Sequence, residues 1–541
     1  MNHNSRDIRL GCANSAEGPP ANTNAITFGS LKAMLRVSFA GSYARFAFFI
    51  RSLAIGAIAI RIAGGSRLVS SGTHGTWQLL RIAPLLLAMP AWASDPLMLE
   101  SCTPFKDKPA VRCGRLSVPE NWGKSDSRHI DLKIVVVPAT GLVKLPPLYD
   151  FPGGPGIAET SGVDFWLTDG AIHHRDRDVV LIDQRGTGGS HVLNCALPFS
   201  DPFHEMFPHD AVRSCRKELG AIADLAQYST DTAVRDVEAV RAAFGHDTID
   251  ISGLSYGTRY AMAYAQAYPQ RVRAMALIGT VPPDMRLPQE FAADAQVVVD
   301  RVLSECATDA DCGRAFPDLS HDWKQLRAQL STTPATFDGR PVNPGAFWES
   351  FRGQLVRADT QRQIPWLIHT LAGQAPGPAL ARLRSDDPSF FASGLLLSVE
   401  CPEDTLHLSA SERASNGKGT FLGNYRVQRQ YAACKDWNVA PRKSAYRTPV
   451  EVKTPALFIV GEMDYVTPPS ATERAQRAFP NSRVVRIDHL GHFPSGLAHI
   501  ECIDEMIAAF FEAGSIEGLD TGCVKHMTPP PFYTAMGAPA H

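Results

Sequence analysis

The segment Gly253-Leu-Ser-Tyr-Gly257 constrains this chain more than any other feature of its sequence. Before it, residues 247–252 alternate β-forming and polar side chains, and after it residues 258–268 are rich in Ala, Tyr and Met. The pattern predicts a strand that turns sharply into a helix with Ser255 at the apex, as in a nucleophile elbow. Glycines suit such a strained turn because a Cβ there would meet neighbouring backbone. The alternative is a glycine turn that contains a serine by chance. Other segments of the chain are needed to distinguish the two interpretations.

Three further segments follow the chain order that α/β-hydrolases require. A glycine-rich run, Pro152-Gly-Gly-Pro-Gly156, comes after a short apolar strand. Asp464 lies just past a buried strand at 454–461, and His492 lies past a second strand at 482–487. Open α/β sheets place their sites where strands end. The order serine, aspartate, histidine therefore predicts an α/β-hydrolase fold with a mostly parallel central sheet.

The chemistry of acyl transfer gives each of these groups a role. Ser255 is predicted to be the nucleophile, His492 the general base that activates it, and Asp464 the group that fixes the imidazole tautomer. The backbone N–H groups of Gly154 and Tyr256 are predicted to form the oxyanion hole. This chemistry needs no cofactor, and no Cys or His spacing in the chain suggests a metal site.

Four motifs together resemble those of one known family. They are the Pro-Gly-Gly-Pro-Gly run, Asp183-Gln-Arg-Gly-Thr-Gly-Gly-Ser190, the elbow followed by Thr258-Arg259, and Gly491-His492. They make the chain similar to the proline iminopeptidase and tripeptidyl aminopeptidase family of serine peptidases, from about Cys102 to Cys523. Proline iminopeptidases usually carry His where this chain has Pro152. With Pro152 at this position, the chain resembles the exported tripeptidyl aminopeptidase branch of the family. This difference argues against strict specificity for proline.

The resemblance also guides the reading of nearby charged residues. His492, in contrast to His489, lies in the Gly-His-Phe-Pro context that the family uses, so His489 is expected to be an ordinary surface or supporting histidine. Asp183 and Arg185 are expected to form a buried pair that braces the loops below the site.

An aminopeptidase must recognise a free α-ammonium group, which calls for carboxylates in a closed pocket. The stretch 398–404 resembles a family segment of the type Val-x-Cys-x-Glu-Asp. Glu403 is therefore the first candidate for the substrate-binding anchor, with Glu400 and Asp404 behind it. The alternative is a solvated acidic turn tied down by Cys401.

These motifs imply a serine exopeptidase that acts near free peptide N-termini through an acyl-enzyme. A carboxylesterase or other ester or amide hydrolase is the alternative, because the same machinery serves both, and a non-catalytic binding protein is disfavoured by the intact triad. The expected partner is thus a peptide or a small ester or amide. The net charge of −2 shows no excess of positive charge of the kind that nucleic-acid-binding proteins use, so nucleic acid is not an expected partner.

The N-terminal region carries a candidate export signal. Arg81 precedes the apolar stretch 82–89, and Ala91-Trp-Ala93 is an A-x-A cleavage site, which predicts a mature chain exported to the periplasm or the extracellular space. A signal peptide spans about 15–30 residues, so we expect translation to start near Leu68 or Val69. Two arginines interrupt the apolar stretch 46–62, and no stable membrane span is expected in the mature chain.

The cysteines support export independently. The chain has 11 cysteines, and all except Cys12 lie in the predicted mature region. An even, locally clustered set suits disulfides in an oxidising compartment, although buried free thiols are the alternative. The candidates fall as sequence neighbours, and the family has comparable local bridges: Cys102 and Cys113, Cys195 and Cys215, Cys306 and Cys312, Cys401 and Cys434, Cys502 and Cys523.

The βα rhythm of the chain predicts where its domains begin and end. Residues 1–93 form the N-terminal extension and signal peptide, and residues 94–281 the first part of the hydrolase core. The alternation of predicted strands and helices is interrupted between residues 282 and 447, where a mostly helical cap is expected over the active site. Residues 448–541 complete the core and add a C-terminal tail.

Overall fold

The computed structural model describes residues 97–102, 110–195, 197–198, 201–331, 335–337, 339–373, 375–384, 391–448 and 450–535. The predicted signal segment and its cleavage site at Ala93 lie outside the described residues, as does the apolar stretch 46–62. Within the described ranges, no helix has the length and apolar character needed to cross a membrane. In the same ranges, no group of His, Cys, Asp and Glu side chains is arranged to hold a metal ion.

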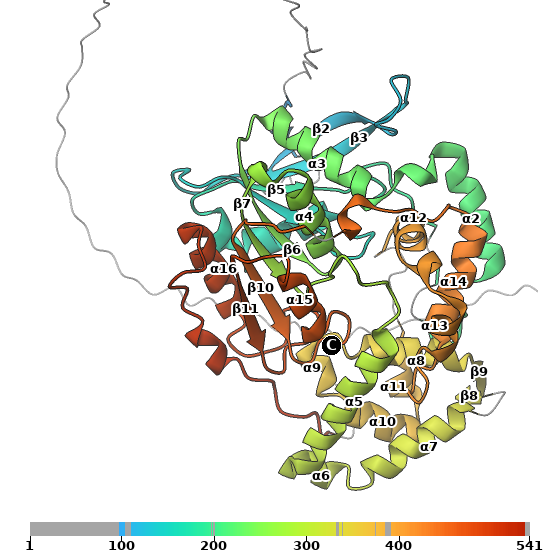
Figure 1. Cartoon of the computed structure of the whole chain (residues 1–541). Coiled ribbons are helices and arrows are strands. Elements are labelled where there is room, and N and C mark those ends of the chain that lie inside the picture. Colours follow the sequence, from blue (N-terminus) through green and yellow to red (C-terminus); the bar gives the residue numbers. More distant parts are fainter. Residues whose placement is uncertain are drawn as a thin grey trace, which may run out of the picture. The chain divides into compact units, whose positions relative to one another are not determined.

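Within the described part of the chain, the core is a nine-stranded sheet in the order β1-β2-β3-β5-β4-β6-β7-β10-β11 (Figure 1). Its strands are β1 (Glu100–Ser101), β2 (Arg112–Pro119), β3 (His129–Val137), β4 (Leu148–Phe151), β5 (Val179–Ile182), β6 (Ile249–Leu254), β7 (Val272–Ile278), β10 (Ala456–Gly461) and β11 (Ser482–Ile487). The pairings from β5 through β4, β6, β7 and β10 to β11 are all parallel, whereas β1, β2 and β3 pair antiparallel. This sheet confirms the predicted α/β-hydrolase fold. Sequence analysis missed β2, which pairs along the length of β3.

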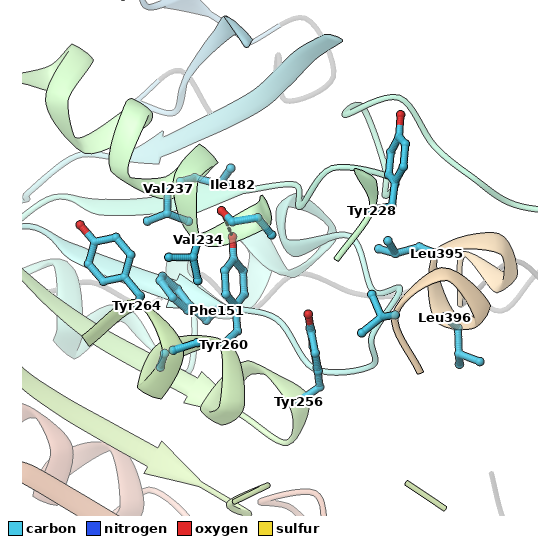
Figure 2. Close-up of a cluster of buried hydrophobic side chains, with 14 of the residues drawn as sticks. Phe151, Ile182, Tyr228, Val234, Val237, Tyr256, Tyr260, Tyr264, Leu395 and Leu396 are labelled. Carbon is cyan, nitrogen blue, oxygen red and sulfur yellow. Dashed lines mark hydrogen bonds between the residues drawn. The ribbon is translucent and has the colours of Figure 1, made fainter. Parts of the chain in front are cut away.

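The helices of the core cover the sheet and bury its apolar strands. They are α1 (Val163–Leu167), α2 (His209–Ile222), α3 (Thr230–Phe244), α4 (Tyr256–Ala267), α15 (Pro469–Gln476) and α16 (Cys502–Ala513). Helix α3 begins at the Ser229 cap, whose side chain accepts from the Thr232 N–H, and ends at Gly245 with a positive φ of 71°. Figure 2 shows side chains of α3 and α4 meeting in this core, and the Tyr260 hydroxyl donates to the Ala233 carbonyl over 2.8 Å.

A mostly helical region lies between β7 and β10 (Figure 1). It contains α5 (Phe291–Thr308), α6 (Ala310–Ala315), α7 (Leu319–Ser331), β8 (Ala335–Phe337), β9 (Arg340–Val342), α8 (Pro344–Gly353), α9 (Ala358–Gln361), α10 (Ile364–Ala372), α11 (Gly377–Arg382), α12 (Ser393–Glu403), α13 (Ala410–Ser415) and α14 (Tyr425–Trp437). Side chains of α5 to α8, α10 and α11 share one apolar cluster with Met463 and Tyr465. Side chains of α12 and α14 instead join the cluster of the core. The region therefore packs on the loop after β10 through one cluster and on the core through the other.

Among the described residues, five disulfides each join one cysteine to the next cysteine along the chain. They are Cys102–Cys113, Cys195–Cys215, Cys306–Cys312, Cys401–Cys434 and Cys502–Cys523. The fourth joins α12 to α14, next to the acidic stretch singled out in the sequence. Such bridges are compatible with an exported protein, because oxidising compartments are where disulfides persist.

Candidate active site

Ser255 lies at a strained turn between β6 and α4. Its φ of 58° and ψ of −125° are rare for a residue with a side chain, and its N–H donates to the Ile278 carbonyl over 3.0 Å. A Cβ on Gly257 would lie 2.0 Å from the Phe151 carbonyl oxygen, and one on Gly253 would lie 2.9 Å from the Gly257 carbonyl oxygen. Only glycine fits at these two positions, so the predicted strand–turn–helix with its flanking glycines is confirmed.

The three residues predicted to react lie together in a hydrogen-bonded chain. The Ser255 Oγ atom is 2.9 Å from His492 Nε2. On the other side of the imidazole, Nδ1 is 3.1 Å from Asp464 Oδ1 and 3.0 Å from Oδ2. Asp464 and His492 are buried, with exposed fractions of 2% and 6%. A serine hydroxyl, an imidazole and a carboxylate in this order can pass a proton from the serine and stabilise the imidazolium that results.

Thr467 is a neighbour of this chain that sequence analysis missed. Its hydroxyl donates to Asp464 Oδ2 over 2.5 Å, and its Oγ1 also lies 3.1 Å from His492 Nδ1. The backbone N–H groups of Val466 and Thr467 donate to Asp464 Oδ1. The loop after β10 thus fixes the carboxylate through three donors. The available signal was a Thr three residues after an Asp at a strand end, a common local capping pattern.

The glycine-rich loop predicted to supply an oxyanion donor runs beside the elbow. Gly154 and Gly156 have φ angles of 113° and 117°, which favour glycine strongly. A Cβ on Gly153 would lie 3.6 Å from the Ser255 Cβ. Ala392, the residue before α12, donates its N–H to the Gly156 carbonyl over 2.9 Å. Tyr256 opens α4, where the first N–H groups of a helix have no partner within the helix.

Glu403 lies behind the elbow, with both carboxylate oxygens bound inside the protein. Oε1 accepts from the Thr230 N–H over 2.8 Å, and Oε2 accepts from the hydroxyls of Thr230 and Tyr446, each over 2.7 Å. The Thr230 Oγ1 atom is also 2.9 Å from the Tyr256 hydroxyl, to which the Gln184 amide donates over 3.2 Å. Burial raises the pKa of Glu403. This carboxylate therefore supports the residue that follows the nucleophile.

The two acidic residues expected behind Glu403 also have internal partners. Asp404 forms ion pairs with Arg259, at 2.8 Å, and with Arg447. Glu400 accepts from the Gln430 amide, and burial raises its pKa to about 7. All three carboxylates lie inside the protein, so the alternative of a solvated acidic turn is wrong, and their oxygens already have internal partners. Burial in the interface between α12, α14 and the core gives all three side chains a supporting position.

The pair expected between Asp183 and Arg185 does not form. The Arg185 guanidinium instead binds Asp236 through two bonds of 2.5 and 2.6 Å. Asp183 accepts from the backbone N–H groups of Thr160 and Gly189, over 2.9 and 2.8 Å. Both residues still brace the loops beneath the site, but each does so through a separate partner.

His489 lies apart from the nucleophile. Its ring is 3.2 Å from the Arg362 guanidinium and 3.3 Å from the Asp488 carboxylate, on the surface beyond β11. Burial is the main reason that its pKa is lowered. His492 is thus the histidine that the fold brings to Ser255.

Comparisons with known proteins support the α/β-hydrolase fold. One family model, described as alpha/beta hydrolase fold, matches residues 146–309, and a second, described as TAP-like protein, matches residues 419–523. A tripeptidyl aminopeptidase of Streptomyces coelicolor is 22% identical over 484 residues, which cover 78% of this chain and 84% of that protein. The serine protease Hip1 of Mycobacterium tuberculosis is 34% identical over 223 residues, covering 37% of this chain and 42% of that protein.

Among solved structures, a proline iminopeptidase of Mycobacterium smegmatis is similar to this chain at 17% identity. The match has a TM-score of 0.39 and covers 74% of this chain and 98% of that structure. The family models and relatives confirm the resemblance drawn from the four motifs. They also identify the chain as an enzyme of the serine hydrolase class.

Proposed function

We propose that this serine hydrolase of the α/β-hydrolase fold is an exported exopeptidase that cleaves peptide bonds near free N-termini. The observation that carries the proposal is the hydrogen-bonded chain from Ser255 through His492 to Asp464 at the ends of parallel strands. The names of the two relatives, tripeptidyl aminopeptidase and serine protease, support a peptide as substrate.

In the proposed mechanism, His492 Nε2 removes the proton of Ser255 Oγ as that oxygen attacks the scissile carbonyl carbon. The N–H groups of Gly154 and Tyr256 bind the oxyanion that forms. His492 then gives the proton to the leaving amine, and a water molecule repeats the sequence on the acyl-enzyme. Asp464 stabilises the positively charged imidazole in both halves of the reaction.

A panel of substrates tests this function directly. Tripeptidyl and aminoacyl anilides with free N-termini should be cleaved with a higher kcat/KM than the same anilides after N-acylation. p-Nitrophenyl esters of short acids serve as the comparison, because esters need the same triad and no ammonium anchor. Efficient ester hydrolysis without anilide cleavage would assign the chain to the carboxylesterases and refute the exopeptidase proposal.

Export is supported by the five disulfides and by the A-x-A site at Ala93. The proposal is that cleavage near Ala93 releases a mature enzyme whose bridges form outside the cytoplasm. Sequencing the N-terminus of the native protein is the direct check. A native chain that begins before Ser70 would contradict the signal-peptide interpretation.

Asp294 on α5 is the carboxylate that we propose as the anchor for the substrate ammonium. Its Oδ2 atom is buried without a hydrogen-bond donor among the described residues. Burial raises its pKa to about 7; the negative charge of Glu290 adds to the shift, the positive charge of Arg474 opposes it, and the charge of Asp464 adds the smallest part. A substrate ammonium near Asp294 would restore the missing partner and favour the ionised form.

Replacing Asp294 with Asn should raise KM about 10-fold or more for anilides with a free N-terminus, because a charge-assisted contact is lost. N-acylated anilides should be unaffected. In the wild type, protonation of Asp294 below its pKa of about 7 removes the negative charge, so KM for free-amine substrates should rise as the pH falls through 7. The variant should lose this dependence. Asp300→Asn, an exposed change on the same helix, is the control. An equal effect on both substrate types would argue against Asp294 as the anchor.

Replacing Glu403 with Gln distinguishes two possible roles of this residue, which are structural support of the nucleophile elbow and binding of the substrate ammonium. The amide cannot accept from all three donors that the carboxylate now binds, so we expect a stability loss of about 1–3 kcal/mol. The decrease in kcat/KM should be the same factor for free and N-acylated anilides. Thermal unfolding and both assays measure this, with the exposed Glu451→Gln as control. A decrease confined to free-amine substrates would return the anchor to Glu403.

A further inference from the structure

One short segment of the helical region between β7 and β10 lies against the loops that carry the acid and the base. The segment is residues 352–361, which comprise the end of α8, the turn that follows it and α9. The two loops are those after β10, which carries Asp464, and after β11, which carries His492. No residue of the segment reacts in the mechanism above, so its contacts with both loops point to a supporting role.

The loop after β10 is held on both sides of Asp464. The Gln361 amide nitrogen donates to the carbonyl of Met463, the residue before the acid, over 3.2 Å. The Arg352 guanidinium donates to the hydroxyl of Tyr465, the residue after the acid, over 2.8 Å. Gln361 and Tyr465 are 3% and 1% exposed, so water competes little for these bonds. The two bonds therefore fix the path of the backbone that carries the acid.

The loop after β11 is held by the same segment on both sides of His492. The N–H of Phe493 donates to the Val356 carbonyl over 3.0 Å. A Cβ on Gly491 would lie 2.6 Å from that same carbonyl oxygen and 3.1 Å from the Gln361 amide nitrogen. Only glycine lets the loop approach the segment this closely. Gln361 thus contacts the loops of both the acid and the base.

The segment also has internal support. A second bond from the Gln361 amide nitrogen, over 2.7 Å to the Leu355 carbonyl, spans the turn between α8 and α9. The Arg352 guanidinium is paired with the buried Glu349 carboxylate over 2.8 Å. The donors that reach the loop after β10 are therefore fixed by their own surroundings, as the support of a catalytic group requires.

We propose that the segment 352–361 holds the acid and base loops in register, and that Gln361 is the positioning residue that joins them. It acts through its contacts with Met463 and Gly491 and touches no reacting atom. A small shift of either loop would disturb the hydrogen bond between the acid and the base, and a misplacement of about 1 Å can lower a rate by about 100-fold. The inference rests on the proposed function only in its use of the catalytic triad, which ester and peptide hydrolysis share.

The test measures kcat and KM with a p-nitrophenyl ester for the wild type, Gln361→Met and Tyr465→Phe. Met keeps the length of the Gln side chain and removes its donors, so kcat should fall about 10- to 100-fold. Tyr465→Phe removes only the hydroxyl that accepts from Arg352, and it should lower kcat by a smaller factor. KM should change little in both variants, because alignment of the acid and the base acts on the transition state.

Gln325→Met is the matched control. The Gln325 amide on α7 also donates to a backbone carbonyl, that of Ala372, over 3.1 Å. This bond joins α7 to the end of α10 instead of joining the helical region to a catalytic loop. The control should lose some thermal stability, as Gln361→Met should, but it should keep the kcat of the wild type. Thermal unfolding of each variant measures the stability.

Proton NMR reports on the alignment itself. His492 Nδ1 lies 3.0 Å from the Asp464 carboxylate, and a proton in such a bond resonates far downfield. The signal is assigned by its absence from Asp464→Asn. It should shift or broaden in Gln361→Met and stay in place in Gln325→Met.

Three outcomes would overturn the inference. The first is a folded Gln361→Met variant with unchanged kcat, and the second is an equal fall in kcat in Gln325→Met. The third is a slower Gln361→Met variant whose downfield signal is that of the wild type. If Gln361→Met does not fold, Tyr465→Phe decides the question by the same measurements. Failure of the exopeptidase proposal is separately visible, because it appears in the wild-type panel of anilides and esters.

Discussion

Replacing Ser255 with Ala is expected to lower kcat by about 10⁶-fold, which is the scale seen when the nucleophile of a serine hydrolase is removed. The remaining turnover would come from the oxyanion donors and substrate binding alone. Stability should change little, because Ala occupies the same strained backbone and the hydroxyl forms its 2.9 Å contact with His492 at the site itself. Steady-state assays on anilides and esters, together with thermal unfolding, measure both expectations.

Covalent labelling by a fluorophosphonate provides the matched check. The wild type and Ser214→Ala, a change at an exposed serine on α2, should be labelled at one position, whereas Ser255→Ala should not be labelled. Substantial turnover or labelling of the Ser255→Ala variant would show that another residue is the nucleophile.

Replacing Asp464 with Asn is expected to lower kcat by about 10⁴-fold at neutral pH. The carboxylate now accepts from two backbone N–H groups at Oδ1 and from the Thr467 hydroxyl at Oδ2, beside His492 Nδ1. An Asn keeps its carbonyl oxygen on the backbone donors and turns its NH₂ group toward the imidazole. The imidazole then carries its proton on Nε2, where it cannot accept the proton of Ser255.

The pH–rate profile and one control separate this effect from a general loss of charge. Asp488→Asn removes an acid that lies at the end of β11 and pairs with Arg301 on the surface, so its kcat should equal that of the wild type. A loss for Asp464→Asn of less than about tenfold would mean that the imidazole tautomer is fixed by another group, with Thr467 the nearest one.

Local patterns in the sequence determined the fold and the three central side chains. The residues before Gly253 alternate as in a strand, and those after Gly257 have helical spacing. Only a few residues separate the two patterns, so the chain between them must form a sharp turn, which is the elbow. The order of Ser255, Asp464 and His492 follows from the order of the strands that carry them. The resemblance to a family with local bridges implied that neighbouring cysteines pair, and the five disulfides join those neighbours.

The partners of the buried charged residues were decided only by tertiary structure. Sequence proximity suggested that Arg185 pairs with Asp183, but helix α3 brings Asp236 to the guanidinium from a distant part of the chain. The acidic stretch around Glu403 was expected either to bind the substrate ammonium or to form a solvated turn, whereas the packing of α12 against the core buries it and gives its carboxylates internal partners. The position of a charged residue in the sequence does not indicate which segments will bury it in the folded protein. Its partners, and with them its pKa and its role, are set by which distant segments the folded core brings within hydrogen-bonding distance.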